Sequence, residues 1–254
     1  MPNSPTSPGR ALSCEAVREL DRASIQDYGI PSLLLMENAG RACAELGHKL
    51  FASRSGARSA IVLVGPGNNG GDGFVIARTL FNLGHAVDLF FVGSLSMIPN
   101  LSEDVQVNER LWRELEPGVT VVQEVQTDSL QILEAALLSG PWLVVDCLFG
   151  TGLSRNLEDP WLAVVGLVNQ HGRGKIPVIA ADIPSGLHGD GGTVMGEAIY
   201  ADHTVTFVAP KPGILRGDGP EHAGEIHVAE IGIPRRLVER ALQQAIAATE
   251  GSHG

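Results

Sequence analysis

The chain has 254 residues, of which 44% are hydrophobic, and it carries a formal net charge of -11 at neutral pH. This length and apolar content are enough to bury a substantial core. The acidic balance and the lack of a basic cluster argue against general binding to nucleic acid or to an acidic membrane, because phosphate groups there are bound mainly by Lys and Arg. A small anionic ligand is still allowed, since a helix N-terminus can bind it through backbone N–H groups.

The cysteines and the first residues indicate a reducing compartment. Cys14, Cys43 and Cys147 are an odd number without metal-ligand spacing, so we expect buried, reduced thiols. Residues 1–10 lack the apolar run of a signal peptide, and no stretch reaches the roughly 18 apolar residues of a membrane span. We therefore expect a disordered arm over 1–11 and a cytoplasmic protein.

Two helices are expected before the first strand. Ser13 is placed to cap a helix whose Val17, Leu20 and Ile25 fall near one face. After a turn at residues 29–31, a second amphipathic helix is predicted over 33–50.

From residue 60 onward, apolar strands alternate with helix-length segments. The strands are predicted at 60–64, 86–92, 119–122, 143–146, 178–182, 204–208 and 225–229, and the helices at 72–83, 102–115, 128–138 and 161–170. Several of these strands are apolar throughout, which indicates burial on both faces. Right-handed crossovers between them predict an α/β protein, a three-layer αβα Rossmann-like domain with a mostly parallel sheet. We expect one domain over 12–240 and a C-terminal tail over 241–254.

The strongest local signal is the glycine-rich turn GPGNNGGDG at residues 65–73, which follows a buried strand and opens a helix. Glycines allow close backbone approach to a ligand, although tight helix–strand packing would explain them as well. The turn lacks the Gly-Lys-Ser/Thr of the nucleotide-hydrolysing P-loop. Asn68, Asn69 and Asp72 add polar side chains at a strand end, where open α/β sheets bind ligands. We therefore favour a binding site over a purely structural turn.

Two further strands end in an aspartate. Asp146 and Asp182 each close an apolar strand, and capping of the next helix is the structural alternative for both. Together Asn69, Asp146 and Ser185 offer only oxygen ligands, which suits a hard cation and not zinc or copper. A single carboxylate favours a monovalent ion such as potassium, with Mg²⁺ as the alternative.

The remaining polar candidates are a lysine and the histidines. Lys211 follows a strand, so it either contacts phosphate at the same edge or is solvated. We consider six of the eight histidines as candidate ligands; they show no ligand spacing, and we expect a solvated or core position for each. These are His85, His171, His188, His203, His222 and His227.

Five segments, in this order, resemble the NAD(P)H-hydrate epimerase family. They are LLLMENAGRA (33–42), VGPGNNGGDGFVIAR (64–78), VVDCLFGTGLSR (144–155), DIPSGL (182–187) and TVTFVAPKPG (204–213). The resemblance implies a usually dimeric, Rossmann-like enzyme that interconverts the R and S forms of hydrated NADH or NADPH. It also implies a functional partner, an ATP- or ADP-dependent hydrate dehydratase.

By motif position, the resemblance assigns roles to individual residues. It implies Asn69, Asp146 and Ser185 as ligands of potassium. We hypothesise that Asp182 is the catalytic residue, acting as general acid and base on the departing and returning oxygen, because a carboxylate with a tuned pKa can serve in both directions. The implied substrate contacts are Asn68, Asn69, Gly70, Gly71, Asp72, Gly150, Thr151, Gly152, Leu153, Ser154, Arg155, Asn156 and Asp182. The alternative is a non-catalytic nucleotide-binding or protein-interaction module of the same fold, since fold does not fix function.

Overall fold

The computed structural model describes residues 11–51, 59–115, 120–122 and 128–251. Their strands form one seven-stranded sheet in the order β3-β2-β1-β4-β5-β6-β7, and every neighbouring pair is parallel. The strands are β1 (Ala60–Val64), β2 (Val87–Val92), β3 (Thr120–Val122), β4 (Leu143–Cys147), β5 (Val178–Ala181), β6 (His203–Phe207) and β7 (Glu225–Ala229). The predicted α/β class and parallel sheet are thus confirmed.

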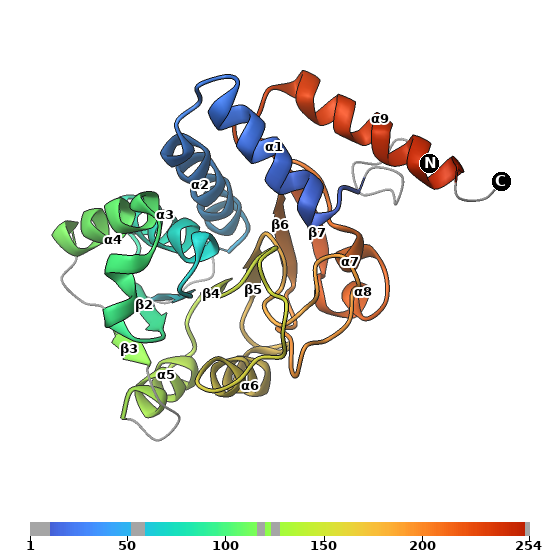
Figure 1. Ribbon diagram of the computed structural model, residues 1–254. Helices are drawn as coiled ribbons and strands as arrows, with labels where there is room; N and C mark the ends of the chain where they lie inside the picture. The colour runs from blue at the N-terminus through green and yellow to red at the C-terminus, as the bar shows by residue number, and fades with distance from the viewer. Residues whose placement is uncertain (1–10, 52–58, 116–119, 123–127, 252–254) are drawn as a thin grey trace.

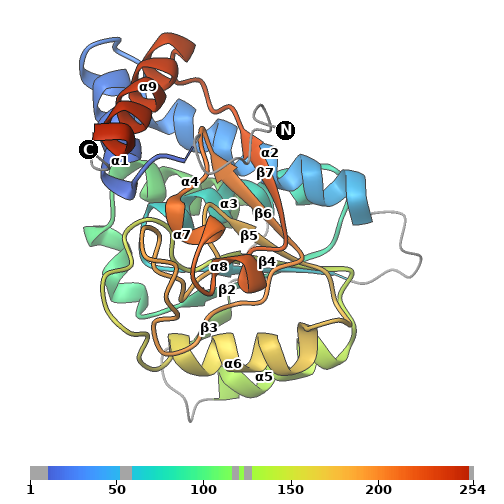
Figure 2. The same ribbon diagram turned by 90° about the vertical axis from the view of Figure 1, so that its right-hand side faces the viewer.

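Helices cover both faces of this sheet, as Figures 1 and 2 show from two directions. The helices are α1 (Cys14–Gln26), α2 (Ser32–Phe51), α3 (Asn68–Asn82), η2 (Leu95–Asn100), α4 (Glu103–Leu115), α5 (Asp128–Leu138), α6 (Trp161–Gly172), α7 (Pro212–Leu215), α8 (Gly219–His222) and α9 (Arg235–Gly251). Helices α5 and α6 lie on one face, whereas α1, α2, α3, α4 and α9 lie on the other. The protein therefore has the three layers that the sequence predicts.

Alternation along each strand divides the core between these layers. In β1, Ile61 and Leu63 face the α5 and α6 layer, while Val62 and Val64 face α2 and α3. All five residues of β1 are buried, which explains its unbroken apolar sequence. The three cysteines are free and buried, in agreement with the sequence prediction.

The sheet order creates a switch point between β1 and β4. From β1 the chain crosses outward to β2 and β3, and then returns to the other side of β1 to form β4. The loops that leave β1 and β4 therefore diverge, and ligands of open α/β sheets bind in the resulting crevice.

The N-terminal helices follow the prediction closely, with one exception. The Ala16 N–H donates to the Ser13 Oγ at 3.1 Å, so Ser13 caps α1 as expected. Val17 and Leu20 are buried, but Ile25 is 37% exposed and the buried Ser24 takes the inward position. The Ser24 hydroxyl donates to the Leu20 carbonyl, which satisfies it inside the helix.

Several predicted boundaries were wrong. Helix α3 begins at Asn68 and not at Asp72, because the glycines there are helical and allow close packing: a Cβ on Gly71 would lie 2.6 Å from Met36. Strand β5 ends at Ala181, so Asp182 lies just beyond it. Helix α9 crosses the expected domain end at 240, and Ala241, Leu242 and Ala245 pack against the core. The arm at 1–10 lies outside the described residues.

No helix among the described residues combines the length and the apolar character needed to cross a membrane.

Candidate active site

A cavity of about 460 Å³ opens at the carboxyl ends of the strands, at the switch point. Its floor comes from the start of α3 and from the loops after β4 and β5, and α1 and α2 form the opposite wall. It collects the following residues of the predicted set: Asn68, Asn69, Asp72, Gly150, Thr151, Gly152, Leu153 and Asp182. Segments far apart in the chain thus meet at one sheet edge, as the sequence predicts.

The other predicted residues lie around the cavity and not in its lining. Gly70 and Gly71 are buried within α3, and Asp146 and Ser185 are buried beneath the floor. The exposed residues Ser154, Arg155 and Asn156 follow Leu153 on the surface.

The cavity floor contains a buried ion pair between Asp182 and Lys211. The Lys211 ammonium is completely buried and donates to one carboxylate oxygen of Asp182. It also donates to the Thr206 hydroxyl and to the Phe207 carbonyl, each at 3.1 Å. Lys211 is therefore neither solvated nor part of the cavity lining, contrary to both sequence interpretations; it holds Asp182 in position.

The second carboxylate oxygen of Asp182 faces the loop after β4. The Thr151 N–H lies 3.3 Å from this oxygen. A Cβ on Gly150 would lie 2.8 Å from the same oxygen, so any residue other than glycine at this position would clash with the carboxylate. Asp182 has a φ of 69°, a left-handed conformation that Asp and Asn tolerate better than most residues.

Three further carboxylates line the cavity, those of Asp21, Asp72 and Asp104. Burial raises the pKa of Asp72 well above its ordinary value; Asp182 and Asp21 raise it further, whereas Lys211 lowers it. Burial also raises the pKa of Asp21 to about 6, with Lys211 lowering it and Asp182 raising it. The cavity therefore holds carboxyl groups that keep a proton at higher pH than free aspartate does.

Asp146, Ser185 and the loop after β4 form a buried hydrogen-bonded cluster. The Ser185 hydroxyl and backbone N–H donate to the two Asp146 carboxylate oxygens at 2.6 and 2.7 Å. The Leu148 N–H adds a third bond at 3.2 Å. Burial raises the pKa of Asp146 to about 6, although these hydrogen bonds lower it. Within the described ranges, no Lys, Arg or His lies within ion-pair distance of Asp146.

Sequence reasoning missed two residues of α1 at the cavity. Arg18 lines the wall and donates to the Thr151 carbonyl at 3.2 Å, and Asp21 lies one turn further along. The hydrophobic periodicity of α1 predicts which face of the helix is buried. It does not predict that polar residues beside that face line the cavity.

The fold and the cavity together define the class of protein to which this chain belongs. A parallel sheet in this order, with a cavity at its switch point that is lined by a helix N-terminus and several carboxylates, belongs to a Rossmann-like α/β protein with a small-molecule site.

Comparisons with known proteins narrow the class to a family. Residues 32–213 match the family described as YjeF-related protein N-terminus. The chain is 34% identical to an NAD(P)H-hydrate epimerase of Rhodopirellula baltica, over 90% of this chain and 87% of that protein. It is 35% identical to another of Weissella koreensis, over 88% and 91% respectively. The chain therefore belongs to the NAD(P)H-hydrate epimerase family.

Other relatives are longer. The chain is 38% identical to a bifunctional NAD(P)H-hydrate repair enzyme of Salinibacter ruber, over 92% of this chain but 42% of that protein. It thus spans about two fifths of the length of such bifunctional relatives. Among solved structures, yeast ynu0 superimposes with a TM-score of 0.73 at 24% identity, covering 91% of this chain and 93% of its own, which supports the fold.

Proposed function

We propose that this protein is an isomerase that interconverts the R and S epimers of hydrated NADH and NADPH. The observation that carries the proposal is the Asp182–Lys211 pair at the floor of the cavity, which supplies a fixed carboxylate where a ligand would bind. The names of the relatives that match over most of their length support it. The alternative, a non-catalytic module, has no need for this buried charge.

The chemistry requires a proton to move twice. In the hydrate, the hydroxyl is on a carbon next to the ring nitrogen, so the nitrogen lone pair expels it and leaves a planar iminium. The departing oxygen takes up a proton and leaves as water. When water adds to the opposite face, it gives up a proton, and the C–O bond forms again with inverted configuration.

Asp182 is the residue we assign to this proton transfer, as general acid and base. A positioned carboxylate contributes roughly 10²–10⁴-fold in such steps. Asp72 is a second group in the same cavity that can donate a proton, because burial keeps it protonated to higher pH. The variant Asp182→Asn should therefore lower turnover by at least about 100-fold, whereas near-normal turnover would overturn the assignment.

We assign the phosphates of the substrate to the start of α3 and to Arg18, both of which lie beside the loop after β4 that also contacts Asp182. The N-terminus of α3 presents free N–H groups, and the Arg18 guanidinium lies at the wall. The volume of about 460 Å³ lies within the range of about 300–1,000 Å³ typical of small-ligand sites. Contacts through Gly70, Gly71 and residues 154–156 stay predictions.

A coupled assay tests the function. The purified chain is added to R-form hydrated NADH together with an S-specific dehydratase and its nucleotide, and recovery of NADH is followed. Recovery well above the spontaneous rate supports the epimerase. No acceleration by the folded chain would favour a binding module instead.

We also propose a potassium ion held by Asn69, Asp146 and Ser185. Both polar side-chain atoms of Asn69 are buried without a hydrogen-bond partner among the described residues, and such orphaned groups are costly. Asp146 is a buried carboxylate that lacks a cationic partner there. Oxygen donors with one negative charge fit a monovalent hard cation. When bound, the ion would neutralise Asp146 and order the loops around the cavity.

The adjacent residues Asn68 and Asn69 provide a matched pair of variants to test whether the protein binds potassium. In wild type, potassium should raise the temperature of unfolding relative to tetramethylammonium, which is too large for the site. Asn69→Ala should abolish this rise while barely changing stability without potassium, because the side chain makes no hydrogen bond. Asn68→Ala, at the exposed neighbour that accepts from Ser102, should keep the rise. Equal stability of wild type in both salts would contradict the site.

Three expectations stay predictions: a homodimer, a cytoplasmic location, and a dehydratase as functional partner. The bifunctional names of longer relatives support the last of these.

A further inference from the structure

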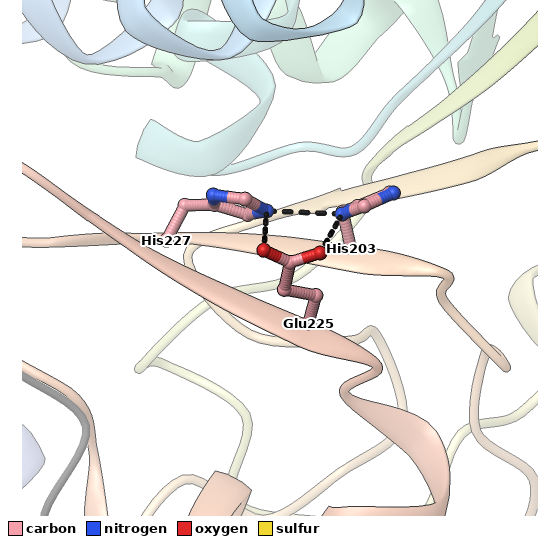
Figure 3. A group of neighbouring side chains, drawn as sticks. All are labelled: His203, Glu225 and His227. Atoms are coloured by element: carbon pink, nitrogen blue, oxygen red, sulfur yellow. Dashed lines mark hydrogen bonds and ion pairs between the residues drawn. The ribbon is translucent and has the colours of Figure 1, made fainter. Parts of the chain in front are cut away.

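His203, Glu225 and His227 meet on neighbouring strands β6 and β7, as Figure 3 shows. His203 is directly opposite Glu225 in the register of the two strands, and His227 lies two residues further along β7 on the same face. The group lies toward the amino ends of these strands, whereas the cavity lies at the carboxyl ends. The sequence had assigned both histidines to solvent or core, because 24 residues separate them and only strand pairing brings them together.

The nitrogen and oxygen atoms of the group face one another. His203 Nδ1 lies 2.9 Å from His227 Nε2. The Glu225 oxygens lie 3.6 Å from His203 Nδ1 and 3.8 Å from His227 Nε2. Throughout the described ranges, no other trio of His, Cys, Asp or Glu brings its ligand atoms this close.

These separations are close to those of a metal-ligand set. Zinc binds imidazole nitrogen and carboxylate oxygen at about 2.0–2.2 Å, so ligand atoms of a tetrahedral site lie about 3.3–3.5 Å from one another. The nitrogen–nitrogen distance of 2.9 Å lies below that value, and the distances of 3.6 and 3.8 Å, which run to different oxygens of Glu225, lie above it. One Glu225 oxygen and the two nitrogens lie within 4.8 Å of one another. A hydrogen bond accounts for the His203–His227 contact, but both carboxylate contacts are longer than hydrogen bonds.

We propose that His203, Glu225 and His227 bind a divalent transition ion of the zinc class. Two imidazoles and one carboxylate are a ligand set that zinc uses, with water as the fourth ligand. The Glu225 side chain is 69% exposed, so solvent can supply that water. Because β7 is the last strand in the sheet order, the ion would stabilise the pairing of this edge strand with β6. The nitrogen donors separate this site from the oxygen-only set proposed for potassium.

Metal titration of the full-length, chelator-treated chain tests the proposal. Wild type should bind one equivalent of Zn²⁺ in competition with a chelating dye and should unfold at a higher temperature when Zn²⁺ is present. His203→Ala and His227→Ala should each weaken Zn²⁺ binding at least tenfold and abolish the thermal shift. Glu225→Gln, which keeps the shape and removes the charge, should weaken binding to a lesser degree.

A second histidine pair provides the control. His48 Nδ1 and His85 Nε2 lie 2.8 Å apart, but among the described residues no carboxylate completes this pair into a trio. The double variant His48→Ala/His85→Ala should therefore bind Zn²⁺ as wild type does. Folding of every variant is checked by its unfolding temperature without metal.

Cobalt reports the geometry. Co²⁺ in the site should give the visible absorption of four-coordinate cobalt without a sulfur-to-metal band, because the three proposed ligands supply nitrogen and oxygen and no sulfur. Failure of wild type to bind Zn²⁺, or equal binding by wild type and the two single histidine variants, would overturn the proposal.

Discussion

Replacing Lys211 by methionine should destabilise the protein strongly. Methionine fills much of the lysine volume but removes the charge, so the Asp182 carboxylate, with 11% of its side chain exposed, would lose its cationic partner. Breaking one side of a buried ion pair costs about 3–5 kcal/mol, because the remaining charge stays buried and unpaired. The Thr206 hydroxyl and the Phe207 carbonyl would also lose their donor.

A double-mutant cycle separates the ion pair from packing. Lys211→Met and Asp182→Asn should each lower the free energy of unfolding by about 3–5 kcal/mol, and the double variant should lose no more than either single variant. Urea denaturation with fixed salt measures all four proteins. Lys175→Met, at an exposed lysine, is the matched control and should stay within about 0.5 kcal/mol of wild type. A loss below about 1 kcal/mol for Lys211→Met, or strictly additive losses, would refute the buried pair.

Two further predictions concern the cavity. Gly150→Ala should push the Asp182 carboxylate aside and lower turnover at least about 10-fold, one 1.4 kcal/mol step. Gly172→Ala lies outside the cavity, and its Cβ would make an ordinary contact of 3.5 Å with Val178, so it should leave turnover unchanged. Equal rates for the two variants would argue against a tight fit around Asp182. Asp21→Asn should stabilise the protein by up to about 3 kcal/mol at pH 8. The native pKa of Asp21 is raised to about 6, so its ionisation destabilises the folded state fully above that pH. Little of this cost remains near pH 4, where the folded carboxyl is protonated and the unfolded one, with a pKa of about 3.9, is roughly half protonated. Urea denaturation at both pH values measures this gain, and a gain that is equal at both would contradict the raised pKa.

The sequence predicts most of the fold because its signals are local. Buried strands such as β1 are apolar throughout, and the helix-length segments between them require parallel crossovers. The start of α3 was misplaced for a physical reason: Gly70 and Gly71 disfavour helix in isolation, but here they allow close packing that outweighs propensity. Helix α9 was missed as an element, although a turn with Gly232 and Pro234 precedes it and its partly buried apolar residues recur at helical spacing.

The candidate site was only partly predictable. Polar residues at strand ends identified Asn69, Asp72 and Asp182, because parallel strands bring their carboxyl ends to one edge. The partner of Asp182 was out of reach, since Lys211 lies 29 residues away and lysine is almost never fully buried unless it is paired. The ion pair between Asp182 and Lys211 depends on tertiary packing, which cannot be predicted from hydrophobic periodicity or from short motifs.

The most direct test of the central claim starts from the S epimer of hydrated NADH alone, without a dehydratase. The R epimer is followed by chromatography with wild-type chain, with Asp182→Asn, and without protein. We predict that wild type speeds the approach to the same R to S ratio that the substrate reaches unaided, because a catalyst cannot shift an equilibrium, and that Asp182→Asn runs close to the spontaneous rate. If wild type does not exceed the spontaneous rate, or if folded Asp182→Asn matches wild type, the proposed epimerase site at Asp182 is contradicted.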